Sequence, residues 1–118
     1  ECVFFMCNFA PPDMVGHTGN YDAAVVAAAD TDRAIGQIYQ TCMEEGVIFA
    51  LTADHGNCEV MVREDGGPHT MHTTNAVPFV TTAGAFTRKD GVLSDVAPTL
   101  LKLMELPVPD VMEGKPLL

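Results

Sequence analysis

The sequence predicts an α/β fold with one open, mostly parallel sheet. Three short apolar runs, at residues 3–9, 47–52 and 76–81, alternate with segments of helical periodicity at residues 20–45 and 94–106. Such alternation is typical of βαβ units, in which a right-handed helical crossover joins two parallel strands. With 118 residues, the chain corresponds to one domain or to part of one.

The first predicted strand, residues 3–9, is almost wholly apolar and stops before Pro11. An apolar run without alternation is typical of a strand that is buried on both faces of a parallel sheet. The helix at residues 20–45 follows, with Asn20 as its candidate N-cap and Gly46 at the C′ position. Apolar residues recur at helical spacing in its second half: Ile35, Ile38, Tyr39 and Cys42.

The rest of the chain contains two further strands and a last helix. A polar, glycine-rich stretch at residues 63–75 separates the strand at 47–52 from the strand at 76–81. In the helix at 94–106, a cap at Asp95 would place Pro98 in the first turn, where its missing N–H does least harm. One face of this helix is apolar: Val96, Leu100, Leu103 and Met104.

The composition argues against two classes of partner. The net charge is −10, with six Lys and Arg against sixteen Asp and Glu, whereas nucleic-acid binding needs clustered positive charge. Apolar runs fall short of the about 20 residues that span a bilayer, so we expect no membrane partner. An acidic chain can still bind an anionic substrate where metal cations offset its charge.

The cysteines and the first residues suggest where the protein is located in the cell and whether the sequence is a fragment. Four cysteines (Cys2, Cys7, Cys42 and Cys58) form no CxxC pair, and we expect reduced, mostly buried thiols in a cytoplasmic protein. The chain begins at Glu1 and enters an apolar run without the basic segment of a signal peptide. We therefore expect a fragment that starts within a strand.

Every histidine lies in one of three short loops next to the predicted strands. These loops are residues 13–17 (DMVGH), 54–57 (DHGN) and 69–72 (HTMH). In open α/β sheets, ligands bind beyond the carboxyl ends of the strands, where at least two of these loops would meet. Aspartate and histidine suit divalent ions such as Mn²⁺, Zn²⁺ or Co²⁺, so the pattern predicts a metal site.

The spacing within each loop supports this prediction to different degrees. Asp13 and His17 are four residues apart, so one helical turn would put both side chains on one face. Asp54 and His55 are adjacent, and a turn after the strand could aim both at one ion. An adjacent Asp-His taken alone is usually a cap or a surface pair, and an Asp and His four apart are more often a coincidence or a salt-bridged pair, so the metal prediction depends on the three loops together. His69 could orient a ligand, contact substrate or bond within its loop.

The remaining chemistry of the sequence is sparse. No nucleophile motif is present, and the single serine, Ser94, lies at the predicted start of the last helix. Asn57, Thr73, Thr74 and Asn75 are expected to organise turns through side-chain bonds to the backbone. Three basic residues could contact a phosphate or could be solvated loop charges: Arg63, Arg88 and Lys89.

At these loops the sequence resembles the 2,3-bisphosphoglycerate-independent phosphoglycerate mutases of the alkaline phosphatase superfamily. The resemblance covers essentially the whole chain but corresponds only to the C-terminal part of such an enzyme. The combination of residues 13–19 (DMVGHTG), 54–57 (DHGN) and 72–75 (HTTN) is its most specific feature. The matching stretches are residues 8–10 (NFA), 12–19 (PDMVGHTG), 52–57 (TADHGN), 66–75 (GGPHTMHTTN), 93–101 (LSDVAPTLL) and 112–118 (MEGKPLL).

The resemblance implies an alkaline-phosphatase-like α/β/α sandwich, of which residues 1–118 would be the C-terminal part of the metal-binding domain. It also implies two Mn²⁺ ions and no 2,3-bisphosphoglycerate. Asp13, His17 and His72 would hold one ion, and Asp54 and His55 would hold part of the other. In the family, an aspartate and a nucleophilic serine from the N-terminal part complete the second site, and neither is present here.

The implied activity is the interconversion of 3-phosphoglycerate and 2-phosphoglycerate in glycolysis through a phosphoserine. Because the serine is missing, we expect the chain alone to be inactive and the remainder of the enzyme to be its partner. Two alternatives stay open. One is a fragment of another two-metal enzyme, such as a phosphopentomutase or a phosphodiesterase, and the other is a short, non-catalytic metal-binding protein.

Overall fold

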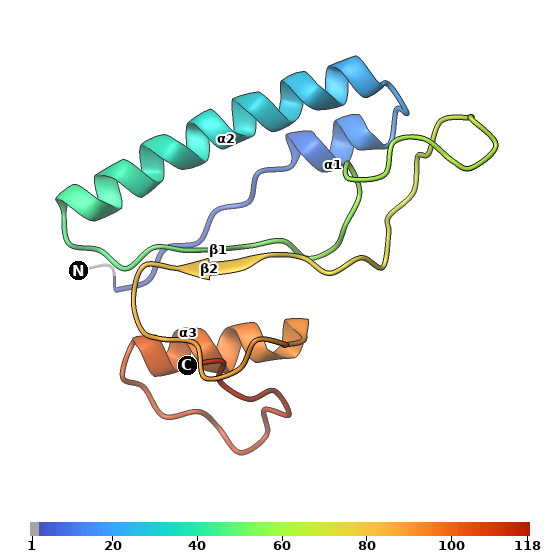
Figure 1. Cartoon of the computed structure of the whole chain (residues 1–118). Coiled ribbons are helices and arrows are strands. Elements are labelled where there is room, and N and C mark those ends of the chain that lie inside the picture. The colour runs from blue at the N-terminus through green and yellow to red at the C-terminus, as the bar shows by residue number, and fades with distance from the viewer. Residues whose placement is uncertain (1–2) are drawn as a thin grey trace. The chain divides into compact units, whose positions relative to one another are not determined.

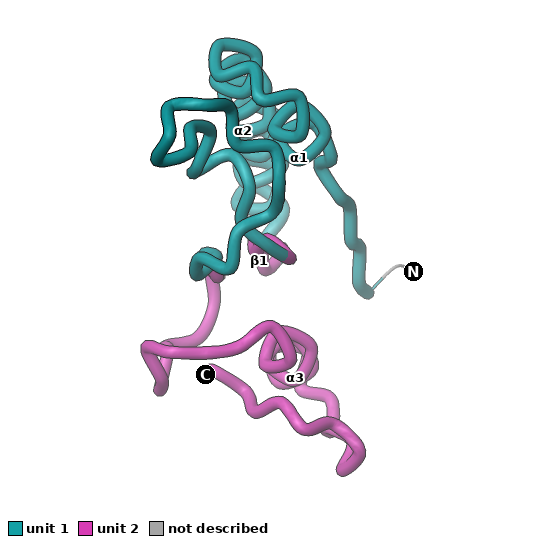
Figure 2. The backbone as a smooth tube through the Cα atoms, turned by 90° about the vertical axis from the view of Figure 1, so that its right-hand side faces the viewer, with its two compact units in different colours: residues 1–47, 55–78 teal, residues 48–54, 79–118 magenta. Residues whose placement is uncertain are grey.

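A computed structural model describes residues 3–118 of the chain, so Cys2 lies outside the described residues. The chain divides into two compact units, which Figure 2 shows in different colours. Unit 1 comprises Glu1–Val47 and His55–Pro78, and unit 2 comprises Ile48–Asp54 and Phe79–Leu118. The elements (Figure 1) are α1 Pro11–Gly16, α2 Tyr21–Glu44, β1 Ala50–Thr52, β2 Phe79–Thr81, the 3₁₀ turn η1 Leu93–Asp95 and α3 Val96–Leu103.

Both ends of α2 are where the sequence places them. The Asn20 side chain accepts a hydrogen bond from the N–H of Ala23 at 3.0 Å, which confirms the N-cap. Gly46 adopts a φ of +65°, and the N–H of Val47 donates to the carbonyl of Cys42 at 2.8 Å. This 6→1 bond is the Schellman ending that a C′ glycine permits without strain.

The buried face of α2 differs from the expected one. Helix α1 packs against α2 (Figure 1), and the buried α2 residues are Ala24 and Ala27 in its first half. Their small side chains allow the two helices to approach closely. Ile38 and Tyr39, which lie on the apolar stripe of the second half, are exposed.

The rest of unit 1 is a loop region that folds back on itself. Two antiparallel bridges, Gly56 with Thr73 and Val62 with Pro68, connect its outgoing and returning halves. Met61 is buried in this region. The loop region returns to the start of α1, so it supplies the side chains of the candidate site described below.

Unit 2 contains the sheet, and its strands are antiparallel. Ala50 pairs with Thr81 and Thr52 pairs with Phe79 in a two-stranded sheet. The prediction of a mostly parallel sheet is therefore wrong for residues 3–118, although the chain is an α/β structure. Parallel neighbours need a crossover, usually a helix, and residues 53–78 contain no helix that could provide one.

The predicted strand at residues 3–9 does not form. The segment is extended without strand pairing, and Val3, Phe5 and Met6 are more than three-quarters exposed. A strand exists only where a neighbour at about 4.8 Å accepts and donates its backbone hydrogen bonds, and apolar composition alone supplies no such neighbour. Cys7 is consequently exposed, which corrects the expectation of a buried thiol, while Cys42 and Cys58 are partly buried.

The predicted last helix begins close to its expected start but ends earlier. Pro98 lies in the first turn of α3, as predicted, and is fully buried. The helix stops at Leu103 because Glu105 adopts a φ of +57° and the N–H of Leu106 donates to the carbonyl of Leu101. No glycine marks this ending, so the sequence pattern extended it to residue 106. Within residues 3–118, no helix combines the length and apolar character that crossing a bilayer requires.

Asp95 and Thr99 fasten the C-terminal segment to unit 2. The Asp95 side chain was expected to cap α3, but it makes no capping bond and instead accepts from the N–H groups of Lys115 at 2.7 Å and Val92 at 3.0 Å. These two backbone donors, with help from Arg88, hold the pKa of Asp95 below its usual value. Thr99, which is fully buried, donates to the carbonyl of Asp95 and accepts from the N–H of Leu117.

Replacing Thr99 with valine should lower the free energy of unfolding of the full chain by about 1–3 kcal/mol, because the buried N–H of Leu117 loses its acceptor. Urea denaturation measures the change. Thr99→Ser keeps the hydroxyl and should retain most of the stability. Equal stability of the valine variant and the parent chain would contradict the role of this hydroxyl.

Candidate metal centre

Helix α1 supplies the first two residues of the site. Two prolines start the helix, with Pro11 and Pro12 where their missing N–H groups are tolerated, and Asp13 follows in the first turn. His17 is the C-cap residue, and its helical backbone places it one turn after Asp13. His17 Nε2 lies 3.3 Å from Asp13 Oδ1, which confirms that the four-residue spacing puts both side chains on one face.

His72 comes from the loop region and closes the cluster. Its Nε2 lies 3.0 Å from Asp13 Oδ1 and 3.1 Å from His17 Nε2. His17 Nδ1 donates to the carbonyl of Thr70 at 2.8 Å, and since a carbonyl only accepts, Nδ1 carries the proton. In its neutral form, His17 therefore presents the lone pair of Nε2 to Asp13 and His72. Fixing a histidine tautomer through a backbone carbonyl is a common feature of metal-ligating histidines.

His55 joins the same cluster from the other half of the loop region. Its Nε2 lies 3.9 Å from Asp13 Oδ1, and its ring stacks on that of His72 with centroids 3.5 Å apart. Gly56 and Thr73, which follow the two histidines, form the antiparallel bridge that brings the rings together. Ligand atoms of Asp13, His55 and His72 all lie within 4.8 Å of one another.

Asn57 holds the carboxylate of Asp13 in place. Its Nδ2 donates to Asp13 Oδ1 at 2.8 Å, and the residue is only 6% exposed. Cys58 supports the same contact, because its thiol donates to the carbonyl of Pro12 at 2.8 Å. Burial raises the pKa of the Cys58 thiol, so the proton needed for this bond is retained at neutral pH.

The electrostatics of the cluster keep Asp13 ionised. The hydrogen bond from Asn57 holds the pKa of Asp13 below its usual value, partial burial opposes this, and the imidazoles of His17, His72 and His55 lower the pKa further. The side chains of the four cluster residues are 27–47% exposed. An ion or a small anion from solvent can therefore reach them.

The donor set of this cluster fits a divalent metal ion. One carboxylate oxygen and three imidazole nitrogens converge, and at least one of those nitrogens, Nε2 of His17, carries a lone pair in the neutral ring. Nitrogen and oxygen donors in this ratio suit Mn²⁺, Co²⁺ or Zn²⁺. No cysteine belongs to the cluster within residues 3–118, which disfavours metals that require thiolate ligands.

The structure thus brings together four of the five predicted ligands: Asp13, His17, His55 and His72. It groups His55 with the first three, whereas the resemblance assigned His55 to a second ion together with Asp54. Asp54 belongs to unit 2, so its role at a second ion stays a prediction.

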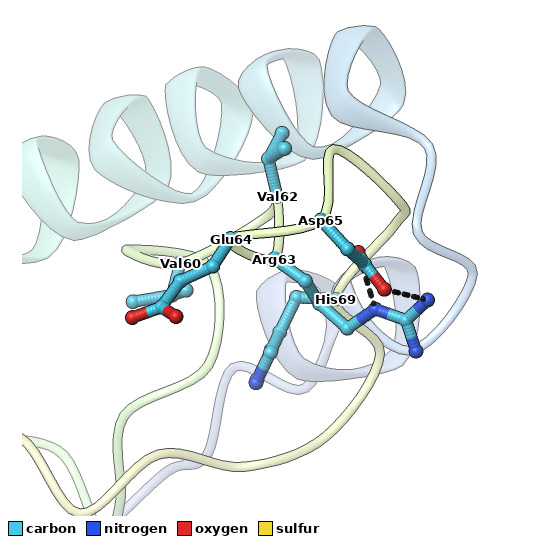
Figure 3. Close-up of a pocket in the computed structure, with 6 residues that line it drawn as sticks. All are labelled: Val60, Val62, Arg63, Glu64, Asp65 and His69. Atoms are coloured by element: carbon cyan, nitrogen blue, oxygen red, sulfur yellow. Dashed lines mark hydrogen bonds and ion pairs between the residues drawn. The ribbon is translucent and has the colours of Figure 1, made fainter.

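His69 lines a separate pocket of about 500 Å³ in unit 1 (Figure 3). Arg63 and Asp65 form an ion pair at its rim, and the Glu64 carboxylate points away from that pair. Arg88 likewise pairs with Asp95. The two arginines considered as phosphate contacts thus have carboxylate partners within the chain, which favours a structural role for both.

Sequence reasoning missed two residues that support the cluster. Asn57 was expected to organise its turn through a bond to the backbone. Its Nδ2 does donate to the backbone carbonyl of Asp13, but it also donates to the Asp13 carboxylate. Glu59 was not singled out, yet it accepts hydrogen bonds from Asn57 and Asn75. The contacts of Asn57 with Asp13 and of Glu59 with Asn75 join residues 44 and 16 positions apart, so no local pattern could have revealed them, whereas the contact of Glu59 with Asn57 spans only two residues.

Comparison with known proteins assigns the chain to a family. The profile described as the metalloenzyme superfamily matches residues 1–108, most of the chain. The chain belongs to the metalloenzyme superfamily. A metal-binding role for the Asp13 cluster agrees with that membership.

Relatives within this superfamily are phosphoglycerate mutases by name. The 2,3-bisphosphoglycerate-independent phosphoglycerate mutase of Onchocerca volvulus is 54% identical over 96% of the chain, and that of Rhodopseudomonas palustris is 54% identical over 94%. A solved structure of Leishmania mexicana phosphoglycerate mutase at low cobalt concentration superposes with a TM-score of 0.74 and 26% identity over 92% of the chain. The chain spans 22–23% of the length of these three relatives.

Gly16→Ala should weaken metal binding through Asn57. Gly16 is buried, and a Cβ there would lie 2.8 Å from Asn57 Cγ and closer still to Oδ1, so the carboxamide would have to move away from Asp13. We expect a stability loss of about 1–3 kcal/mol from overpacking and weaker binding of Co²⁺. Urea denaturation and a Co²⁺ titration measure the two effects.

Gly36→Ala is the matched control, because a Cβ at this position in α2 meets nothing within 4 Å. It should leave Co²⁺ affinity unchanged and stabilise the chain by up to about 1 kcal/mol, the helix propensity difference. Unaltered Co²⁺ affinity in Gly16→Ala would show that Asn57 does not depend on this close packing.

Proposed function

We propose that this chain is the metal-binding, C-terminal part of a phosphoglycerate mutase that interconverts 3-phosphoglycerate and 2-phosphoglycerate in glycolysis. In this proposal it forms part of an alkaline-phosphatase-like α/β/α sandwich. The whole enzyme would be a cytoplasmic isomerase, and the remainder of the enzyme would be the partner of this segment.

One observation carries the proposal. Four of the five residues that the mutase resemblance singles out as ligands lie together, with Asp13 Oδ1 approached by His72 at 3.0 Å, His17 at 3.3 Å and His55 at 3.9 Å. They come from three segments up to 59 residues apart in sequence. Identity of about half over nearly the whole chain supports the same family of reactions.

In this proposal Asp13, His17 and His72 hold one divalent ion, and Asp54 and His55 contribute to a second. Bound divalent cations would neutralise charge on the transferring phosphoryl group and lower the pKa of an attacking hydroxyl. The resemblance places the attacking serine outside the segment matched here, so this chain would contribute ligands and no nucleophile.

The residues of this chain have defined tasks before any ion arrives. Thr70 fixes the tautomer of His17, and Asn57 orients the Asp13 carboxylate and keeps it ionised. Both effects reduce the rearrangement that metal binding would otherwise require. The mutase names of the relatives favour this function over a phosphopentomutase, a phosphodiesterase or a non-catalytic metal-binding protein.

The full chain should bind Co²⁺ and Mn²⁺, and both Asp13→Asn and His72→Ala should weaken binding by more than about tenfold, since the first removes the negative charge of a ligand and the second removes a ligand nitrogen. Isothermal titration gives the affinity, and the visible absorption of Co²⁺ reports on its coordination. Asp30→Asn is the matched control, because Asp30 is an exposed aspartate on α2 that pairs with Arg33.

Equal affinities of the parent chain, Asp13→Asn and Asp30→Asn would show that bound metal lies elsewhere. Metal binding should also weaken at acidic pH, because protons compete with the metal for the ligand atoms.

Mutase activity should appear only when the missing three-quarters of the enzyme are supplied. A chimera in which this chain replaces the corresponding segment of the Onchocerca volvulus mutase should be active, since the two segments are 54% identical. Asp13→Asn in the chimera should reduce turnover by more than about 100-fold, beyond the loss typical of removing a supporting residue. An enolase-coupled assay of 2-phosphoglycerate formation measures both.

The chain alone should show no turnover in the same assay. Activity of the chain alone that His72→Ala abolishes would contradict the absence of a nucleophile. An inactive but folded chimera that binds Mn²⁺ would favour a different substrate.

A further inference from the structure

We propose that Glu59 is a positioning residue for the metal centre, acting as a clamp between the two loop segments that carry His55 and His72. No sequence motif and no similarity assigns a role to this residue. The inference rests on the proposed metal-binding function and adds to it the group that sets the distance between two of its ligands.

Each oxygen of the Glu59 carboxylate holds a different segment. Oε2 accepts the backbone N–H of Asn57 at 2.6 Å, two residues after His55. Oε1 accepts the hydroxyl of Thr73, the residue after His72, and the side-chain N–H of Asn75 at 3.0 Å. One side chain therefore connects the segment after His55 to the segment after His72.

The backbone between these segments confirms that the contact is close. The N–H of Thr73 donates to the carbonyl of Gly56 at 2.8 Å, and the imidazoles of His55 and His72 stack at 3.5 Å. Gly56 is buried, and a Cβ on it would collide with both Thr73 Oγ1 and Glu59 Oε1. The glycine of the Asp-His-Gly-Asn motif thus leaves room for the Glu59 clamp.

The clamp also reaches Asp13. Glu59 fixes the backbone N–H of Asn57, and the side chain of Asn57 donates to Asp13 Oδ1 at 2.8 Å. A shift of the Asn57 backbone would move this donor and the carboxylate together. Through Asn57 and Thr73, Glu59 acts on three of the four clustered ligands without itself belonging to the cluster.

Only an ionised carboxylate satisfies all of these donors. The backbone N–H of Asn57 and the side-chain NH₂ group of Asn75 can only donate, and they bind different oxygens of Glu59. In Glu59→Gln one oxygen becomes an NH₂ group, so one segment loses its acceptor whichever way the amide turns. The substitution keeps the size of the side chain and therefore tests the bonds.

The test compares Co²⁺ affinity, the Co²⁺ absorption spectrum and urea stability in the full chain for the parent, Glu59→Gln and Glu64→Gln. Glu64 is an exposed glutamate of the same loop region, which makes it the matched control. We expect Glu59→Gln to bind Co²⁺ about tenfold more weakly with an altered spectrum, the scale for residues that support ligands. Glu64→Gln should match the parent.

A second variant separates positioning from general stability. Thr73→Val removes the hydroxyl that donates to Glu59 and should weaken Co²⁺ binding to a similar degree. The double variant with Glu59→Gln and Thr73→Val should bind Co²⁺ with an affinity within about twofold of that of Glu59→Gln alone. Additive losses in the double variant would overturn the clamp. The clamp would also be overturned if Co²⁺ affinity fell in proportion to urea stability while the Co²⁺ spectrum stayed unchanged.

The outcomes also distinguish this inference from the proposed function. If the parent binds Co²⁺ and Glu59→Gln binds it equally well with the parent's spectrum, the clamp is wrong and the metal site stands. If the parent does not bind Co²⁺, the proposed metal site is wrong and the clamp has no ligands to position.

Discussion

The structure of unit 1 depends on one carboxylate oxygen, Asp13 Oδ1, on which the three imidazoles of the cluster and one carboxamide converge. In its neutral form His17 turns the lone pair of Nε2 toward this oxygen at 3.3 Å, and a lone pair and a carboxylate repel each other. The Asn57 donor offsets part of this repulsion and stabilises the anion. A divalent cation would offset the rest, which is the physical reason why the cluster indicates a metal site and not merely an ion pair.

The ligands are held mainly by groups that are not ligands. The Thr70 carbonyl orients His17, Asn57 orients Asp13, and Cys58 ties its loop to the first turn of α1. Each bond joins residues more than forty positions apart in the sequence. These three long-range bonds all lie next to the ligands. A short helix and irregular loops, with no extended sheet, can present a defined donor set because these bonds connect them.

The accuracy of the sequence predictions follows the range of the interactions involved. The Asn20 cap, the Gly46 ending and the shared face of Asp13 and His17 depend on neighbours within one helical turn, and all three were predicted correctly. Strand pairing depends on partners far away. The strand at residues 3–9 was predicted wrongly for that reason, whereas the antiparallel sheet could have been anticipated from the lack of helical periodicity in residues 53–78. The contacts of Asn57 with Asp13 and of Glu59 with Thr73 and Asn75 belong to the same long-range class.

The charge of the cluster differs from that of the chain in a way that bears on the proposed substrate. The chain carries a net charge of −10, but the described cluster holds one carboxylate and three imidazoles that are neutral when they ligate. A divalent ion would therefore leave the cluster with a local charge of about +1, surrounded by an acidic surface. In the proposed function, the acidic surface would attract the cation, and the occupied site would then attract the phosphate of an anionic substrate. Because Arg63 and Arg88 are already paired with Asp65 and Asp95, we expect the metal centre and not these two arginines to attract phosphate within this segment.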